Sequence, residues 1–386
     1  MMKRKLRMGM IGGSLDAFIG AVHRKAASLD GQIELVCGAF SSSPEKSRAT
    51  GASLFLNPER VYGSYEEMIL KEKQLPADQR MDFVSIVTPN HVHFGPAKMA
   101  LENGFHVIID KPLSFNLKEA KALEKLVAKT GLVFALTHTY TGYPLVKEAK
   151  AMVKQGKLGK IRKVYVEYPQ GWLSTFLEAT GSKQATWRTD PARSGAGGAI
   201  GDIGTHAANL AEYITGSDIT EICAQLNIVV KGRKLDDDSA MLIKFENGAS
   251  GILMATQVAA GEENNLNIRI YGEKGGISWR QEEPNSLEIK WLDRPKEILR
   301  AGWGYLGEIA KQNSRTPSGH PEGYLEAFAN LYKNFASAVA DYKPGKKVDP
   351  AKYDFPDVTD GVRGMAFVES VVKSSRSNQK WTKIKI

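Results

Sequence analysis

Cysteine is scarce in this sequence, since only Cys37 and Cys223 occur among its 386 residues. Each lies in an apolar or strand-like run, so we expect two small core residues and no disulfide framework. Long apolar runs are missing too, because none approaches the roughly 18 residues that span a bilayer. The basic start at residues 1–5 is not followed by the apolar core and cleavage site of a signal peptide. We therefore predict a cytoplasmic protein with no membrane partner.

Clustered positive charge is also lacking, although the net charge is +9. The lysines are spread over helical stretches such as 118–129 and 147–160. No arginine-rich segment with interleaved aromatic residues is present, so the sequence predicts a solvated basic surface and no nucleic-acid partner. The chain has no cysteine cluster, and His91 and His93 have no obvious third ligand, so no metal site is expected.

The first part of the chain alternates short apolar runs with helical patterns. The runs expected to be strands are 6–11, 33–40, 83–87, 107–109 and 132–136. Apolar residues between 117 and 127 recur at helical spacing. Such alternation predicts βαβ units and a parallel sheet. Because one core seldom exceeds about 250 residues, we predict two domains, an α/β Rossmann domain at 1–138 and a second domain at 139–386.

The apolar spacing changes to period two after about Gly159. The runs with this spacing are 163–168, 221–230, 240–245 and 266–271, and helical patterns return at 323–342 and 359–373. Asn247-Gly248 predicts a hairpin with a type I′ turn. The second domain is thus expected to be α+β, with a large, open, mostly antiparallel sheet. Apolar residues such as Ile268 and Ile270 are expected to be exposed on it and to form the interface of a homodimer or homotetramer.

Three glycines follow the first expected strand. Gly12, Gly13 and Gly20 precede a helical stretch that is expected to begin at about Ala21. Glycines at this place allow a tight turn and let the backbone approach a pyrophosphate at a helix N-terminus. The loop is about three residues longer than the standard motif, and an ordinary glycine loop is the alternative. We predict a dinucleotide site.

The end of the second expected strand lacks the acid that usually holds the adenosine ribose. Ser41, Ser42, Ser43 and Lys46 occur there instead. With no carboxylate to repel a 2′-phosphate, hydroxyls and a cation could bind one, and NADP should bind at least comparably to NAD. The alternative is a serine turn that caps the next helix. The cofactor is therefore NAD or NADP.

Three further segments carry a family resemblance. They are TPNHVH at 88–93, DKP at 110–112 and GGAIGDIGTH at 197–206. In this order and spacing the chain resembles the Gfo/Idh/MocA family, named for glucose–fructose oxidoreductase, inositol dehydrogenase and rhizopine catabolism, from Leu6 to the last helix. The resemblance implies an NAD(P)-dependent oxidoreductase acting on a sugar or cyclitol. The longer glycine loop and Asp110, where the family usually has glutamate, are departures.

The same segments supply candidate catalytic residues. Asp202 and His206 are four positions apart at an expected helix start and therefore share one face. Histidine titrates at about pH 6.5, which suits a base that takes a hydroxyl proton. Asp202 can orient the imidazole or accept a hydrogen bond from a second sugar hydroxyl. Lys111 ends a parallel strand and can stabilise an alkoxide and hold the nicotinamide ribose. The alternatives are a core histidine, a helix N-cap and a surface lysine. The resemblance also assigns Pro89 and Asn90 to the cofactor.

Aromatic and hydrogen-bonding residues provide a candidate substrate site, since sugars offer both C–H surfaces and hydroxyls. The candidates besides His206 are His138, Tyr140, Tyr168, Gln170, Trp172, Arg188 and His320. Core packing is the alternative for the aromatic residues.

The sequence thus predicts hydride transfer between NAD(P) and a secondary hydroxyl of a sugar, glycoside or cyclitol. A glucoside 3-dehydrogenase and an inositol dehydrogenase are examples of such enzymes. The alternatives on the same scaffold are an NAD-dependent glycoside hydrolase that oxidises its substrate transiently and a cofactor-sensing regulator.

Overall fold

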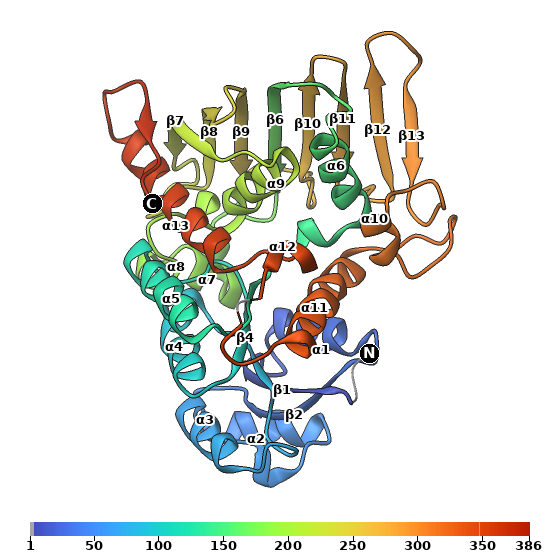
Figure 1. The fold of residues 1–386 in the computed structure, drawn as a ribbon. Coiled ribbons are helices and arrows are strands. Elements are labelled where there is room, and N and C mark those ends of the chain that lie inside the picture. The colour runs from blue at the N-terminus through green and yellow to red at the C-terminus, as the bar shows by residue number, and fades with distance from the viewer. Residues whose placement is uncertain (1–3, 347) are drawn as a thin grey trace. The chain divides into compact units, whose positions relative to one another are not determined.

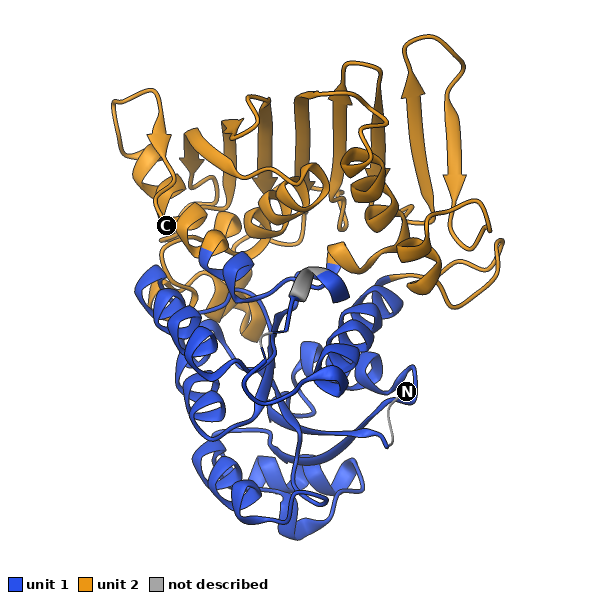
Figure 2. Ribbon diagram, viewed as in Figure 1, with its two compact units in different colours: residues 1–139, 324–362 blue, residues 140–323, 363–386 orange. Residues whose placement is uncertain are grey.

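The computed structural model describes residues 4–346 and 348–386, so residues 1–3 of the basic start lie outside the described residues. Two compact units divide the chain: residues 1–139 with 324–362, and residues 140–323 with 363–386 (Figure 2). The sequence placed one boundary at 138/139, whereas in the structure the chain returns to the first unit through residues 324–362. No helix within the described residues is long and apolar enough to cross a membrane.

The first unit contains a parallel sheet, as predicted. Its strands among the described residues are β1 (Leu6–Gly12), β2 (Ile33–Ala39), β3 (Phe83–Val87), β4 (His106–Ile109) and β5 (Phe134–Leu136). They lie in the order β2-β1-β3-β4-β5, and every pair is parallel. The strand order reverses between β1 and β3. In open parallel sheets, ligands bind beyond the carboxyl ends of the strands at such a switch point.

Five helices connect or follow these strands. They are α1 (Phe18–Ser28), α2 (Pro44–Ser53), α3 (Tyr65–Gln74), α4 (Phe94–Glu102) and α5 (Leu117–Thr130). Local signals set the ends of α5: the Asn116 side chain accepts a hydrogen bond from the Glu119 backbone N–H, and Gly131 takes a left-handed conformation after the last turn.

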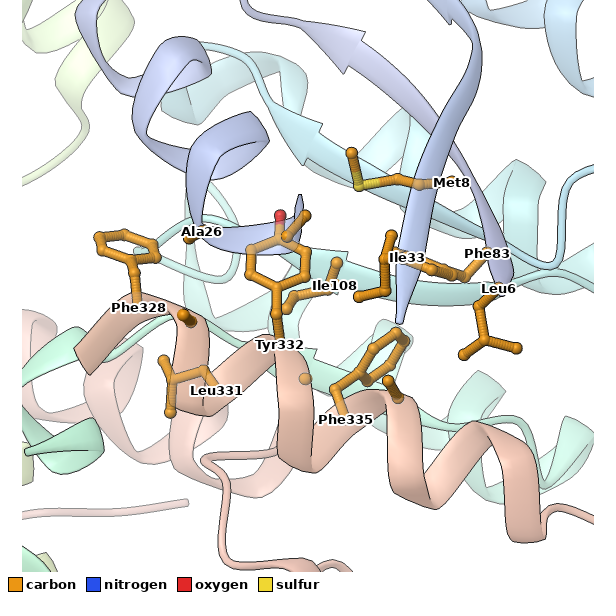
Figure 3. Close-up of a cluster of buried hydrophobic side chains, with 14 of the residues drawn as sticks. Leu6, Met8, Ala26, Ile33, Phe83, Ile108, Phe328, Leu331, Tyr332 and Phe335 are labelled. Carbon is orange, nitrogen blue, oxygen red and sulfur yellow. The ribbon is translucent and has the colours of Figure 1, made fainter. Parts of the chain in front are cut away.

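Helix α11 (Tyr324–Asp341) completes the core of the first unit. Its buried side chains Phe328, Tyr332 and Phe335 pack among residues of α1, β1, β2, β3 and β4 (Figure 3). The short helix α12 (Pro350–Tyr353) follows it, and α13 (Val358–Ser375) begins in the first unit and ends in the second. The sequence predicted the helix at 323–342, but its apolar stripe did not reveal which sheet it covers.

The second unit contains a sheet of nine strands among the described residues (Figure 1). They are β6 (Ile161–Pro169), β7 (Ile219–Asn227), β8 (Asp238–Phe245), β9 (Ser250–Thr256), β10 (Asn267–Gly272), β11 (Gly275–Arg280), β12 (Ser286–Trp291), β13 (Glu297–Arg300) and β14 (Thr382–Lys383). The order is β13-β12-β11-β10-β6-β9-β8-β7-β14. The β6–β9 pair is parallel and the other pairs are antiparallel. The expected large, mostly antiparallel sheet is thus confirmed.

Helices cover one face of this sheet. Helix α9 (Thr205–Thr215) packs on the central strands β6 and β9, and helix α6 (Pro144–Lys154) packs on β11 and β12, nearer the β13 edge (Figure 1). The shorter helices are α7 (Lys183–Arg188), α8 (Pro191–Ser194) and α10 (Glu308–Gln312). Buried strand residues such as Val164 and Leu253 lie among the core residues of this unit.

The hairpin at Asn247-Gly248 is present, but its turn type was predicted wrongly. A type I′ turn needs a positive φ at both central residues, whereas Gly248 has φ +88° and Asn247 is not among the residues with positive φ. The Gly248 N–H donates to Phe245 O, and the Asn247 side chain accepts from the Ala249 N–H. This is the three-residue connection in which glycine supplies the left-handed position.

The prediction that Ile268 and Ile270 are exposed is wrong, because both are buried, with exposed fractions of 1% and 0%. Side chains alternate between faces, so an error of one position in assigning the buried face inverts the whole strand. Their neighbour Arg269 lies partly exposed. The homodimer or homotetramer stays a prediction, and a contact on this sheet would use the other face, where Leu242 and Ile252 are 43% and 39% exposed.

The stability of the protein should depend on His106 of β4. This side chain is 7% exposed, its Nδ1 accepts a hydrogen bond from Val133 N, and burial lowers its pKa to about 4. Between about pH 4 and 6.5 the unfolded chain binds a proton here that the folded chain does not, so stability should fall as the pH falls through this window. The contribution should be about 3 kcal/mol at most.

We expect His106→Gln, which keeps a side-chain acceptor without titrating, to flatten the pH dependence of the free energy of unfolding in that window. Urea denaturation between pH 4 and 7 measures it. The exposed His91 provides the matched control, His91→Gln, which should leave the slope unchanged. An unchanged slope in His106→Gln would contradict this role for His106.

Candidate active site

The glycine loop of the first unit forms a close-packed turn. Gly12 and Gly13 have φ values of +82° and +75°, which favour glycine. A Cβ on Gly20 would lie 2.3 Å from the Gly13 Cα, so the helix can approach the turn only with glycine there. Helix α1 begins at Phe18, earlier than the expected Ala21, and Gly20 therefore lies in its first turn. The additional residues of the long loop precede the helix.

The turn after β3 borders this loop. A Cβ on Gly12 would lie 3.0 Å from the Thr88 Cγ2, and the Thr88 Oγ1 is buried without a hydrogen-bond partner in the described part of the chain. Pro89 is exposed and Asn90 is buried, as the first residue of a short 3-10 turn. We call Gly12, Gly13 and Gly20 the glycine cradle. A buried hydroxyl with no protein partner beside this cradle, at the switch point of the sheet, fits a bound dinucleotide.

His93, for which the sequence gave no metal-binding role, joins two turns. It is fully buried, its Nε2 lies 2.8 Å from Thr88 O, and its Nδ1 lies 2.6 Å from Pro112 O. The ring thus links the TPN turn to the DKP turn, whereas His91 is exposed. This link was not predicted, because the two turns are distant in sequence.

Lys111 follows β4 and is half-buried. The side chain of its neighbour Asp110 accepts hydrogen bonds from Lys111 N at 2.9 Å and Thr137 Oγ1 at 2.8 Å. Burial opposes ionisation of Asp110, but His23, Lys111 and Thr137 outweigh it and hold the pKa of this carboxyl below its usual range. Burial first, and then the charge of Lys111, lower the pKa of His138 to about 3. A carboxylate and a neutral imidazole therefore surround Lys111.

The serines after β2 take part in local turn structure. The Ser43 side chain accepts from Lys46 N at 3.3 Å and so caps α2, and the Ser41 hydroxyl accepts from Ser43 N at 3.2 Å. Ser42 is exposed. The Lys46 Nζ lies 4.0 Å from a carboxylate oxygen of Asp16 in the glycine loop. The longer loop thus brings an acid next to the only cation that we assigned to the cofactor in this turn.

In the second unit, Asp202 and His206 lie on consecutive helical segments. A π-helical turn, Ile200–Gly204, carries Asp202 and runs directly into α9, where His206 is 8% exposed. One oxygen of Asp202 accepts a hydrogen bond from Gln257 Nε2 at 2.9 Å and lies 3.3 Å from Arg188 Nε. The His206 ring packs edge-on against Tyr140, with centroids 4.9 Å apart.

A chain of hydrogen bonds joins several other candidates to Asp202, and ring contacts with Tyr140 and Tyr168 join His206 to it. Gln257 Nε2 donates to Gln170 Oε1 at 3.3 Å, and the Trp172 ring nitrogen donates to the same oxygen at 3.1 Å. Both Gln170 Nε2 and the Tyr168 hydroxyl donate to Asn264 Oδ1, each at 2.7 Å. The Tyr140 hydroxyl hydrogen-bonds to that of Tyr168 and accepts from Asn264 Nδ2 at 3.3 Å. Six of the residues predicted for this unit therefore lie in one network: Tyr140, Tyr168, Gln170, Trp172, Arg188 and Asp202.

His320 does not join this network. It is exposed in the loop after α10, where its carbonyl oxygen accepts from the Thr316 hydroxyl, and Glu322 holds this loop through the Thr316 N–H. No hydrogen bond or ring contact ties its imidazole to the network in the described residues, so the structure gives His320 no place in it.

Sequence reasoning missed two members of the network, Gln257 and Asn264. Both lie in the connection between β9 and β10. A lone glutamine or asparagine in a polar loop carries no pattern, so no signal in the sequence pointed to them.

Comparison with known proteins identifies the two parts of the chain. Residues 6–138 match the model described as "Oxidoreductase family, NAD-binding Rossmann fold", and residues 146–278 match the "GFO/IDH/MocA C-terminal domain". The oxidoreductase YfiI of Bacillus subtilis, called uncharacterized, is 31% identical over 99% of this chain and 98% of its own length. The chain belongs to the Gfo/Idh/MocA family of oxidoreductases.

Two further similar proteins carry names that describe a cofactor or a substrate. An inositol dehydrogenase homologue from Azotobacter vinelandii, solved with NAD+, is 33% identical, with a TM-score of 0.92 over 99% of this chain and 98% of that one. The same homologue has also been solved with NADH and myo-inositol. Levoglucosan dehydrogenase of Pseudarthrobacter phenanthrenivorans is 28% identical over 74% of this chain and 76% of its own. The first unit is accordingly an NAD-binding Rossmann domain.

The described residues contain no group of three or more histidine, cysteine or acidic side chains that could hold a metal ion.

Proposed function

We propose that this protein transfers hydride between NAD and a secondary hydroxyl of a sugar, glycoside or cyclitol. The observation that carries the proposal is the network of the second unit, in which Asp202 and the buried His206 share their surroundings with Tyr140, Tyr168 and Arg188. Aromatic faces and fixed hydrogen-bonding groups are what a polyol needs. Relatives named as inositol and levoglucosan dehydrogenases support this substrate class.

His206 accepts the proton of the substrate hydroxyl, since a base within hydrogen-bond reach is needed as the carbon–oxygen double bond forms. Asp202 stabilises the imidazolium that results and is itself held by Gln257 and Arg188. Lys111 stabilises the developing alkoxide through its ammonium group. NAD, when bound, supplies the acceptor for the hydride of the carbinol carbon.

The cofactor is proposed to lie on Gly12, Gly13 and Gly20, with Pro89, Asn90 and Lys111 nearer the nicotinamide. In contrast to the expectation from the serine turn alone that NADP binds at least comparably, we infer that NAD is preferred to NADP. Two of the three serines after β2 are engaged in the turn, and the Asp16 carboxylate partly offsets the charge of Lys46. A carboxylate near that position would repel a 2′-phosphate.

A panel of sugars, glycosides and cyclitols that includes myo-inositol, levoglucosan and glucose, each with NAD+ and with NADP+, tests the proposal. Absorbance of the reduced nicotinamide should rise with NAD+ and at least one compound, and more slowly with NADP+. Faster reduction of NADP+ would contradict the cofactor preference alone.

The same panel separates the two alternatives. Cleavage of a glycoside without net reduction of added NAD+ would indicate a glycoside hydrolase that oxidises its substrate transiently. Binding of NAD+ with no turnover of any compound would indicate a cofactor-sensing regulator. Either result would contradict the proposed dehydrogenase.

A further inference from the structure

We propose that the loop between β7 and β8, residues 228–237, supports the candidate site of the second unit through two positioning residues. Asp236 positions residues 197–206, the segment that carries Asp202 and His206. Arg233 positions residues 175–188, the segment that carries Arg188. This inference rests on the proposed function, because it assigns supporting roles to residues that do not themselves react.

Asp236 holds the start of the catalytic segment. It is 8% exposed, and its two carboxylate oxygens accept hydrogen bonds from Gly198 N at 2.7 Å and Ile200 N at 2.8 Å. The Asp236 carbonyl oxygen accepts a third, from Ala199 N at 2.8 Å. One residue thus pairs with three successive backbone N–H groups that have no partner in the preceding turn of a helix.

The contact is close enough to require glycine. A Cβ on Gly198 would lie 2.1 Å from the Asp236 carbonyl oxygen and 3.0 Å from the Leu235 Cβ. These hydrogen bonds also affect the position of Asp202, because the Gly198 carbonyl oxygen accepts a hydrogen bond from Asp202 N at 2.9 Å. Asp202 therefore belongs to a segment whose first residues are held in place by hydrogen bonds to Asp236.

Arg233 holds a different segment. Its side chain is 1% exposed, and it donates to Glu178 Oε1 at 2.8 Å and to Thr175 O at 2.7 Å. Burial opposes ionisation of Glu178, but Arg233 outweighs it and lowers the pKa of that carboxyl. Residues 175 and 178 lie at the start of the 175–188 segment, which continues through α7 to Arg188. The Arg188 guanidinium lies next to the Asp202 carboxylate and packs on the Trp187 ring.

Asp237 connects the contacts made by Asp236 with those made by Arg233. Its carboxylate accepts from Val229 N, Val230 N and Arg233, at 2.7, 2.9 and 3.1 Å, and so fixes the loop itself. Its carbonyl oxygen accepts from Gln257 N at 2.8 Å, and the Gln257 side chain donates to Asp202. The loop is therefore linked to Asp202 by two routes, through Gly198 from Asp236 and through Gln257 from Asp237.

The two residues should affect different kinetic constants. A displacement of about 1 Å at reacting groups can cost about 100-fold in rate, so loss of Asp236 should lower kcat. Loss of Arg233 should loosen the Arg188 side of the site and weaken substrate binding in ground state and transition state alike, which raises KM. A merely structural role would move both constants, or neither, in both variants.

The experiment uses the full chain with NAD+ bound. Asp236→Asn should lower kcat by about 10- to 100-fold with KM within about threefold, and Arg233→Met should raise KM by about tenfold with kcat within about threefold. Gly198→Ala should reproduce the kcat loss from the other side of the contact. Asp238→Asn is the matched control, because Asp238 accepts from the Asn227 side chain instead. Myo-inositol and glucose are the first substrate probes.

Amide hydrogen exchange, read peptide by peptide, supplies a measurement that needs no substrate. Exchange should rise in residues 197–206 for Asp236→Asn and Gly198→Ala, and in residues 175–188 for Arg233→Met. Unchanged exchange, or a rise across the whole chain, would overturn the proposal, as would equal changes of kcat and KM in both variants. If the wild-type protein turns over no panel compound, the proposed function fails, whereas local exchange still decides whether these residues position the two segments.

Discussion

His206→Ala is expected to lower kcat by about 10²- to 10⁴-fold, the usual contribution of a general acid–base group. The imidazole is the proposed proton acceptor, and its neighbours, Tyr140 and Tyr168, lie in ring contact with it. The variant should bind NAD+ almost as the wild-type protein does, because His206 belongs to the second unit and the glycine cradle to the first. Single-turnover reduction of NAD+ at saturating cofactor and substrate measures the effect on the chemical step.

The control for this variant is His106→Gln, a buried histidine that is not among the proposed cofactor, catalytic or substrate residues, which should keep the wild-type rate at neutral pH. If His206→Ala retains more than about a tenth of the wild-type rate, the loss is smaller than acid–base catalysis explains. His206 would then not be the base.

Lys111→Met is expected to lower kcat over the same range, about 10²- to 10⁴-fold, and to weaken NAD+ binding as well. Methionine keeps an unbranched side chain, one atom shorter than that of lysine, and removes the charge. That charge is the one proposed to stabilise the alkoxide, and it also lowers the pKa of His138. The measurements are single-turnover reduction of NAD+ and a fluorescence titration with NADH.

Lys118→Met is the matched control, since Lys118 is exposed in the first turn of α5. It should leave both the rate and the affinity for NADH unchanged. A Lys111→Met variant that loses affinity for NADH but keeps its rate at saturation would limit Lys111 to binding the cofactor.

The sequence alone determined what depends on short segments. The apolar run at 83–87 is β3 to the residue, because five buried residues bounded by a turn motif leave few alternatives. Gly12 and Gly13 were recognised because a tight turn demands positive φ. The GGAIGDIGTH segment predicted a helix start that carries Asp202 and His206, since their spacing is a local property of a helix. The structure has a π-helical turn at Asp202 that runs into α9 at His206.

The tertiary structure decided everything that depends on which segments meet. Ile268 and Ile270 alternate correctly, yet only packing against the helices selects the face of β10 that is buried. Helix α11 is recognisable by its apolar stripe, but any apolar surface would satisfy that stripe, and the fold assigns it to the first unit. The contacts of Asp236 with Gly198 and of Gln257 with Asp202 join residues far apart along the chain. A hydrogen bond between distant residues leaves no periodicity in the sequence, because its geometry exists only after the chain has folded.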